Sequence, residues 1–251
     1  MNSGSSLLDA LYGNQQASGG DPVLALQRAV KNQTKAVATE AKQPEVARDI
    51  AAFRKAVAKA PDAKTLLADP VARKVLLTAN GLGSQTDYAA LASKALLSDT
   101  SKPDSLASKL SNAQWLTAAK TFDFANKGLS VLKDPKVLDS IANGYAEVAW
   151  RKSLDESTPG LSNALDFRSR ASTIKTAYQV LGDATLREVV TVALGIPKEI
   201  AYQSLEAQAK AIMDRVDLTK FSKASFAEQF TRRYLVANSI NSSGQSSGLF
   251  V

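Results

Sequence analysis

Aspartate is followed directly by proline three times in this chain, at residues 21–22, 69–70 and 134–135. The pair is a strong signal for the start of a helix. The aspartate carboxylate accepts hydrogen bonds from the first free backbone N–H groups, and proline fits the first helical position without losing a bond. No segment shows the alternation of apolar and polar residues between hairpin turns that indicates strands. The sequence therefore predicts an all-α fold.

Proline, glycine and capping residues set the other helix boundaries. A pairing of Ser84 with Asp87 resembles a capping box at the start of one helix. The break at residues 158–160 separates one long helix from a predicted helix over 161–181, and Pro197 opens another that runs to Val216. The predicted helices cover approximately residues 22–42, 44–59, 62–68, 70–80, 85–98, 135–157, 161–181, 184–194 and 197–216. A short helix is expected after a cap at Asp104 or Ser105, and a longer one contains Trp115, Phe122 and Phe124 before Gly128. The last helix is expected after a cap at Ser222 or Ser225.

Two stretches, 53–91 and 167–205, align without a gap at a shift of 114 residues. The identities fall at positions with a structural role. Asp69 and Asp183 stand at helix starts, and Gly81 and Gly195 stand where a helix end favours a positive φ. Such a register indicates a repeat. We expect a compact domain with an internally duplicated helical unit, whose copies span about 53–116 and 167–235, with residues 104–160 as the connection.

The duplicated register also repeats a charged pair. Asp69 and Arg73, like Asp183 and Arg187, are spaced i, i+4 on a first helical turn, where a carboxylate can cap the helix and bridge to the arginine. Because each pair recurs within the scaffold, a structural role is favoured over a charged functional site.

Both ends of the chain are polar and poor in charge. Residues 1–20 predict a disordered tail with an apolar patch, and residues 241–251 predict a second disordered tail that closes on apolar residues. Between them, residues 21–240 are expected to form a single all-helical domain. The two apolar patches consist of Leu7, Leu8, Leu11 and Tyr12, and of Leu249, Phe250 and Val251.

The chain contains no histidine and no cysteine. These absences exclude a Ser-His triad, an imidazole base, a thiol nucleophile and the usual zinc sites. The remaining candidate motifs give only weak support for catalysis or cofactor binding. Two Ser-x-x-Lys pairs, Ser130 with Lys133 and Ser172 with Lys175, lack the companion motifs of serine-nucleophile enzymes. Gly81-Leu82-Gly83 lacks the rest of a dinucleotide fingerprint, and Asp155-Glu156 indicates a solvated helix end. No catalytic, cofactor-binding or metal-binding residue is predicted, and no cofactor.

The net charge of +7 and a pI near 9.5 raise the hypothesis of a nucleic-acid-binding protein. Basic residues are dispersed, however, and Arg232-Arg233 is the only adjacent arginine pair, so a basic solvated surface is the favoured interpretation. Aromatic residues are expected to fill the core of the bundle rather than to stack on a ligand: Trp115, Phe122, Phe124, Phe226, Phe230 and Tyr234.

The segment from Ala164 to Leu235 resembles domain-of-unknown-function family number 1217. The residues that carry the resemblance are Ala164-Leu165-Asp166-Phe167-Arg168, Leu181-Gly182-Asp183, Ala193-Leu194-Gly195-Ile196-Pro197 and Arg233-Tyr234-Leu235. The first copy, with Asp69-Pro70 and Trp115, is similar to the family's N-terminal half. The resemblance covers roughly residues 25–238. It implies an all-helical alphaproteobacterial protein often encoded in flagellar gene clusters, and it implies no catalytic residue.

We therefore expect a non-enzymatic structural or protein-interaction protein associated with the bacterial flagellum or its assembly, with other proteins as partners. The alternatives are a cytoplasmic regulator or export chaperone and, less favoured, a nucleic-acid binder. The first residues lack the basic and apolar regions of a cleaved secretion signal, and no stretch is apolar enough to span a membrane. The predicted location is the cytoplasm, or the flagellum after export without a cleaved signal. A small-molecule ligand is left open.

Overall fold

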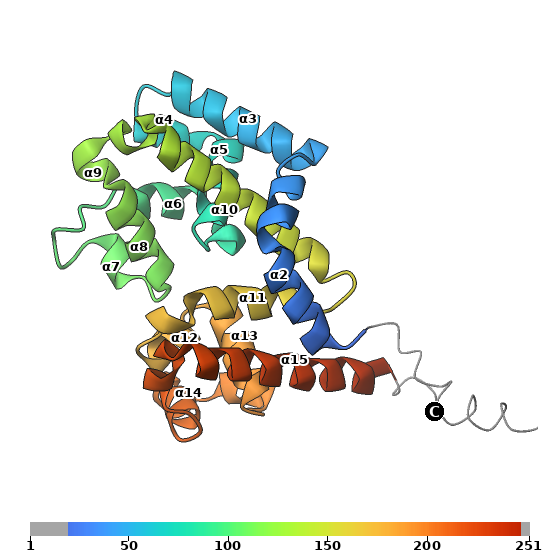
Figure 1. The fold of residues 1–251 in the computed structure, drawn as a ribbon. Helices are drawn as coiled ribbons and strands as arrows, with labels where there is room; N and C mark the ends of the chain where they lie inside the picture. The colour runs from blue at the N-terminus through green and yellow to red at the C-terminus, as the bar shows by residue number, and fades with distance from the viewer. Residues whose placement is uncertain (1–19, 247–251) are drawn as a thin grey trace, which may run out of the picture.

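The computed structural model describes residues 20–246, and every regular element within them is a helix (Figure 1). This confirms the all-α fold class. The α-helices are α2 (Pro22–Glu40), α3 (Pro44–Lys59), α4 (Ala63–Ala68), α5 (Pro70–Ala79), α6 (Ala89–Leu96), α7 (Leu106–Lys109), α8 (Ala113–Phe122), α9 (Phe124–Lys127), α10 (Pro135–Leu154), α11 (Leu161–Arg170), α12 (Ala177–Leu181), α13 (Ala184–Ala193), α14 (Leu205–Met213) and α15 (Ala224–Ser246). The 3₁₀ turns are η1 (Gly83–Gln85), η2 (Ser130–Lys133), η3 (Ala171–Thr173), η4 (Lys198–Tyr202) and η5 (Leu218–Ser222).

The three Asp-Pro pairs all start helices. Asp21, Asp69 and Asp134 stand at the N-caps of α2, α5 and α10, and each carboxylate accepts a backbone N–H of the first turn at 2.8–2.9 Å. Each side chain thereby satisfies a donor that the helix itself cannot pair. The predicted helix starts at these positions are confirmed.

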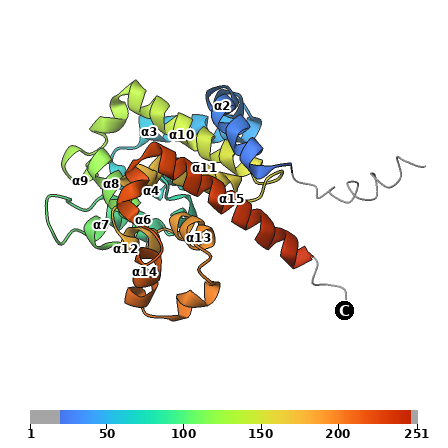
Figure 2. The same ribbon diagram turned by 60° about the horizontal axis from the view of Figure 1, so that its bottom comes forward.

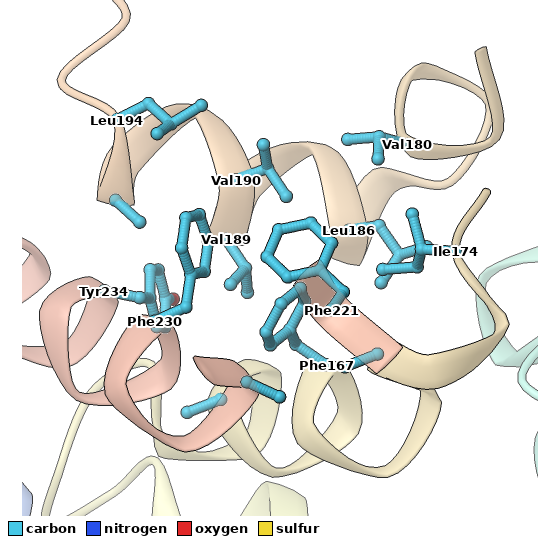
Figure 3. Close-up of a cluster of buried hydrophobic side chains, with 14 of the residues drawn as sticks. Phe167, Ile174, Val180, Leu186, Val189, Val190, Leu194, Phe221, Phe230 and Tyr234 are labelled. Atoms are coloured by element: carbon cyan, nitrogen blue, oxygen red, sulfur yellow. The ribbon is translucent and has the colours of Figure 1, made fainter. Parts of the chain in front are cut away.

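Two hydrophobic cores organise the described residues. The first lies among α3–α10, and the second among α11–α15. In the second core Phe167, Phe221 and Phe230 pack their rings 4.9–5.4 Å apart (Figure 3). The aromatic residues that were expected in the core are buried in one core or the other, except that Phe226 is only partly buried against the second core. Large rings thus fill the space that an alanine-rich bundle leaves open.

Helices α2 and α10 take part in both cores. Leu26 of α2 is buried in the second core, while Val37 near the other end of α2 packs against both. On α10, Tyr145 is buried in the first core and Trp150 in the second. Figure 1 shows α2 and α10 crossing near the junction of the two halves, and they pack against each other. They therefore fix how the two cores sit relative to each other.

The halves of the chain, residues 44–154 and 161–246, have matching helix caps and matching helix ends. Asp69 and Asp183 cap α5 and α13, which start 114 residues apart. Both helices end in a Schellman motif: the N–H groups of Gly81 and Leu82 bond to the carbonyls of Thr78 and Leu77, and the corresponding groups of the second half do the same. Gly81 and Gly195 have φ values of 75° and 61°, which only glycine adopts readily.

The correspondence continues beyond the aligned stretches, at a different shift. Helices α10 and α15 start 89 residues apart, each directly after a 3₁₀ turn, and both contain a buried tyrosine, Tyr145 and Tyr234. Helix α10 packs on α3 and α5 as α15 packs on α11 and α13. Helix α10 lies within the predicted connection of residues 104–160. Between α6 and α10 the first half also contains α7–α9, residues 106–127, which are called the insert below.

Four local predictions differ from the structure. The single helix over 161–181 is divided into α11, η3 and α12, because Thr176 and Gln179 form a capping box that starts a new helix. The segment after Pro197 forms η4 before Ser204 caps α14. The Ser84–Asp87 box does not form, since Leu82 is buried after the turn at Gly81 and η1 begins at once. The helix predicted to contain Phe122 and Phe124 breaks between them, at Asp123, whose φ is 47°.

Helix α15 continues to Ser246, six residues into the segment that was expected to be a tail. Extending a helix from a packed base is easier than starting one, because the costly nucleus already exists. The predicted tail residues 1–19 and 247–251 lie outside the described residues.

The two halves touch where the backbone between α12 and α13 meets the backbone between α7 and α8. A Cβ atom added to Gly182 would lie 2.2 Å from the carbonyl oxygen of Ser111. The aligned residue of the first half is Ala68. Glycine at 182 therefore permits a close approach between the insert and the second half that no other residue would allow.

We expect Gly182→Ala to lower the free energy of unfolding by about 1–3 kcal/mol, because the methyl group overlaps a backbone carbonyl that can move only with the insert. Urea denaturation followed by circular dichroism measures the effect. Gly20→Ala is the matched control, since nothing lies within 4 Å of its added Cβ. Equal stability of the two variants would contradict the close contact.

Candidate functional site

Two hollows flank the contact between Gly182 and Ser111. One, called the cleft below, has a volume of about 460 Å³ and lies between the end of α5, the start of α8, and helices α10 and α11. The other, called the groove, has a volume of about 420 Å³ and lies between α7 and α8 on one side and α12 and the start of α14 on the other. The insert forms part of the wall of both. Ligand sites commonly lie at such junctions between packed units.

The cleft contains a chain of ion pairs. Arg151 of α10 donates to Asp166 of α11 at 2.9 Å and also to Glu147 one turn away. Arg170 donates to Asp183, the N-cap of α13, at 2.8 Å, and to Asp166. Asp166 is thus shared by both guanidinium groups. The five residues join α10, α11 and α13 along one wall of the cleft.

This pairing leaves little proton-transfer chemistry in the cleft. Burial works against the charged form of Arg170, but the hydrogen bond that Arg170 donates to Asp183 and the charge of Asp166 hold its pKa above the ordinary value. Each of the three carboxylates accepts at least one arginine N–H. A general base needs a carboxylate that is free to take a proton. The cleft is therefore built to hold helices together, although Arg170 Nε is buried without a hydrogen-bond partner.

The predicted i, i+4 bridges do not form. Asp183 caps α13 through the N–H of Leu186 and pairs with Arg170 instead of Arg187. In the first half, Arg73 donates to the carbonyls of Leu67 and Thr86, both at 2.9 Å. The capping geometry explains the result, because a carboxylate turned toward the free N–H groups of its helix faces away from the side chain at i+4. The expected caps are confirmed, and the expected bridges are wrong.

The groove differs from the cleft because no charged residue lines it. Its walls carry the apolar side chains of Ala107, Leu110, Leu116, Tyr178, Leu181 and Leu205, together with hydroxyl and amide groups. Tyr178 and Leu205 are each 50% exposed at its rim, and Tyr202 of the adjoining η4 is 92% exposed. Among the hollows of the described residues for which the lining was determined, the other four all contain charged side chains. Exposed apolar surface of this kind marks interaction sites.

The first core contains a polar cluster that the sequence did not reveal. Asp49 accepts hydrogen bonds from Lys74 at 2.8 Å and from the Tyr145 hydroxyl at 2.7 Å. The aligned residues of the second half are Asn163 and Glu188, beside Tyr234. Burial raises the pKa of Tyr234 to about 12. Because Asn163 and Glu188 replace Asp49 and Lys74, the second half does not repeat the ion pair, and only the register between the halves could have pointed to these positions.

Burial and hydrogen bonding act in opposite directions on Asp49. Burial opposes its charge, but the hydrogen bonds from Lys74 and Tyr145 outweigh this and lower the pKa of the carboxyl below its ordinary 3.8. Asp49 and Tyr145 also raise the pKa of Lys74. The cluster is therefore an ion pair that remains charged through the physiological range.

The Ser-x-x-Lys pairs do not bring their functional groups together. Lys175 Nζ donates to the backbone carbonyl of Ser172 and not to its hydroxyl, while Ser130 and Lys133 line a separate hollow beside α3.

The expectation that Asp155 is simply solvated is wrong: its carboxylate accepts the N–H of Ser162 at 2.8 Å, and burial raises its pKa. It serves the start of α11 across the break at Gly160.

Four basic residues that stand next to another basic residue in the sequence form ion pairs within the molecule. Arg54 pairs with Asp139, Lys74 with Asp49, and Arg232 with Glu228. Arg151 lies in the cleft network. Within residues 20–246 there is no group of three or more carboxylates placed to hold a metal ion, and no helix there is long and apolar enough to cross a membrane.

We expect Asp166→Asn to lower the free energy of unfolding by about 1–3 kcal/mol, because it removes the carboxylate that Arg151 and Arg170 share and leaves each guanidinium with one carboxylate partner in a part-buried site. Asp139→Asn is the matched control and should cost less than about 1 kcal/mol, since its pair with Arg54 is exposed. Chemical denaturation of both variants gives the comparison. An equal loss in the two would show that the cleft network contributes no more than a surface pair.

The lowered pKa of Asp49 predicts a dependence of stability on pH. Its folded-state pKa lies below the unfolded value of 3.8, so its contribution is present above about pH 4 and is lost as the pH falls through the folded pKa. In Lys74→Met the main cation that lowers this pKa is gone, and we expect unfolding free energy to fall less steeply below pH 4. Lys210→Met, which removes an exposed pair with Asp214, should keep the wild-type slope, and the same slope in both variants would contradict the prediction.

Comparisons with known proteins give a family and a fold. A family model described as "Protein of unknown function (DUF1217)" matches residues 79–226, which is more than half of the chain. The fold is similar to the crystal structure of a protein from Agrobacterium tumefaciens, with a TM-score of 0.74 and 21% sequence identity over 87% of this chain and 93% of that one. No curated protein matches. The matched region contains the insert, the cleft network and the groove, and the chain belongs to this family of unknown function, DUF1217.

Proposed function

We propose that this chain is a non-enzymatic protein-interaction protein that works through the groove between the insert and the second half. The observation that carries the proposal is the exposed apolar surface of Tyr178, Tyr202 and Leu205 beside a hollow without charged lining. Keeping large apolar side chains in water is unfavourable by about 25 cal/mol per Å² of apolar area. A partner that covers them gains that free energy.

The state of the polar groups supports a binding role over a catalytic one. In the cleft, every carboxylate is paired with an arginine, and Asp49 is paired with Lys74. Catalytic groups are usually held with a pKa close to the working pH, whereas these ion pairs move the pKa of Asp49 and Arg170 away from neutrality. These residues therefore serve as supports that hold the interaction surface in shape.

The proposed setting is the bacterial flagellum or its assembly, in an alphaproteobacterium. This part of the proposal is supported by the family resemblance, which implies a flagellar gene neighbourhood. A regulator or export chaperone that stays in the cytoplasm is the alternative, since it too would present an apolar surface to a helical partner.

We further propose that the two halves arose by duplication of one helical unit. The shared caps at Asp69 and Asp183, the paired Schellman motifs and the match of α10 with α15 support it. After duplication, the insert of residues 106–127 gave the first half the surface that faces α12. The interaction surface would then lie at the place where the two copies differ most.

Cell fractionation tests the flagellar proposal. In a strain with a functional flagellar export apparatus we expect the protein in sheared flagella or the culture supernatant, and in a strain without it we expect retention in the cells. A known cytosolic protein in the same fractions controls for lysis. Detection only in the cytosol of both strains would contradict export and favour the regulator or chaperone.

A further inference from the structure

A third hollow, with a basic lining, lies at the edge of the first half. It has a volume of about 630 Å³ and lies between the end of α3, helix α9, the turn η2 and the start of α10. Figures 1 and 2 show α9 and the start of α10 together at this edge of the molecule. The hollow shares no residue with the cleft or the groove, and it is called the basic hollow below. Its volume is within the range of small-molecule sites.

Three cations from three different elements line the basic hollow: Arg54 of α3, Lys127 of α9 and Lys133 of η2. None of the described residues that line it is acidic, whereas carboxylates stand beside the cations in the lining of the other charged hollows. Arg54 pairs with Asp139, and Lys127 with Asp123, but each cation has more donors than one pair uses. Like charges gathered around one concavity attract an anion.

Lys133 provides a positive charge that the protein leaves unpaired. Within residues 20–246, Lys133 Nζ has no hydrogen-bond or ion-pair partner. The carboxylate of the adjacent Asp134 accepts the backbone N–H of Lys136 at 2.9 Å, where it caps α10. The ammonium group of Lys133 is therefore available to a ligand.

The floor of the basic hollow is apolar. Leu132 is fully buried there, and Val57, Leu129 and Leu138 are half-buried beside it. An aliphatic chain that covers these side chains removes apolar area from water. Cations above an apolar floor complement a molecule with an anionic head and an apolar tail. Nucleic acid would leave the floor uncovered, and it is usually bound by a longer stripe of basic residues.

The second half closes the space that the basic hollow occupies in the first. The duplication proposed above pairs η2 with η5 and Leu132 with Phe221, 89 residues later. The turn η5 packs on both η3 and α15, and the ring of Phe221 lies 5.7 Å from that of Phe226. In the first half, α3 continues unbroken to Lys59 and η2 packs on α10. A bound aliphatic chain would take the place that aromatic rings fill in the second half.

We propose that the basic hollow binds a free medium-chain aliphatic carboxylate. The carboxylate pairs with Lys133 Nζ, and Arg54 and Lys127 add to the positive potential around it. The tail lies on the leucines of the floor, so that one hollow holds both head and tail. This site is separate from the interaction surface proposed above.

Isothermal titration calorimetry of the full chain with sodium octanoate tests the proposal. We expect one site with a dissociation constant on the order of 100 µM at low salt, which is within the range of small ligands of this size. Hexanoate, whose tail is shorter by two methylene groups, should bind up to about 15-fold more weakly, because each buried methylene contributes about fourfold. Octan-1-ol has the same tail without a charge and should bind at least about tenfold more weakly. Added salt should weaken the binding of octanoate by screening the cations.

Two exposed positions give variants that alter the basic hollow and leave the core intact. Lys133→Glu reverses the free charge just before α10, where the helix dipole favours an acid, and should weaken octanoate binding at least about tenfold. Ala58→Trp places a large side chain in the hollow from an exposed position of α3 and should abolish binding. The matched controls are Lys220→Glu on η5 and Ala51→Trp, two turns earlier on α3. Both positions are exposed and lie outside the hollow, so both variants should bind octanoate as the wild type does.

Four results would overturn the proposal. The first is an absence of binding at up to about ten times the expected dissociation constant. The second is equal affinity for octan-1-ol and octanoate, since the cations would then contribute nothing. The third is unchanged binding in Lys133→Glu or in Ala58→Trp, which would place the ligand elsewhere. The fourth is binding to phosphatidylglycerol vesicles without binding of free octanoate, which would assign the cations to a membrane surface.

The test is independent of the interaction role. The basic hollow and the groove have no residue in common, so a failure of octanoate to bind leaves the proposed function in place. Detection of the protein only in the cytosol of both strains would in turn leave the carboxylate site in place.

Discussion

The joint burial of α2 and α10 in two hydrophobic cores is the constraint on which the rest of the structure depends. Tyr145 and Trp150, little more than one turn apart on α10, belong to different cores. Neither core can therefore shift along α10 without exposing an aromatic side chain to water. This fixed placement brings the loop at Ser111 against Gly182 and leaves a hollow on each side of the contact.

The two halves share helix caps and turns but differ in the polar groups between their helices. Helix caps, Schellman turns and buried rings recur because each solves a local problem of hydrogen bonding or packing. Polar groups between helices are free to differ: Asp49 and Lys74 form an ion pair, while the aligned Asn163 and Glu188 lie beside Tyr234. The insert gives the first half a wall that the second half lacks. The groove depends on this asymmetry.

Sequence reasoning succeeded where a single residue controls its own neighbourhood. Asp69 and Asp183 were predicted as caps because the hydrogen bond lies within one turn. It failed where two local signals compete, as in residues 161–181, where Thr176 starts a new helix inside an unbroken apolar pattern. It also failed for the partner of Asp183, since Arg170 lies 13 residues away and is brought close only by the packing of α11 on α13. The groove could not be predicted at all, because its walls come from segments about 70 residues apart.

The sequence by itself determined the helical class, most helix starts, the positions of the glycine turns and the absence of imidazole and thiol chemistry. These properties depend on the residue itself or on neighbours within one helical turn. Only the tertiary structure decided which half α10 belongs to, which cations the carboxylates meet and where apolar surface remains exposed. These properties depend on how closely each helix packs against its neighbours. That packing is set by the volumes of the side chains in both cores.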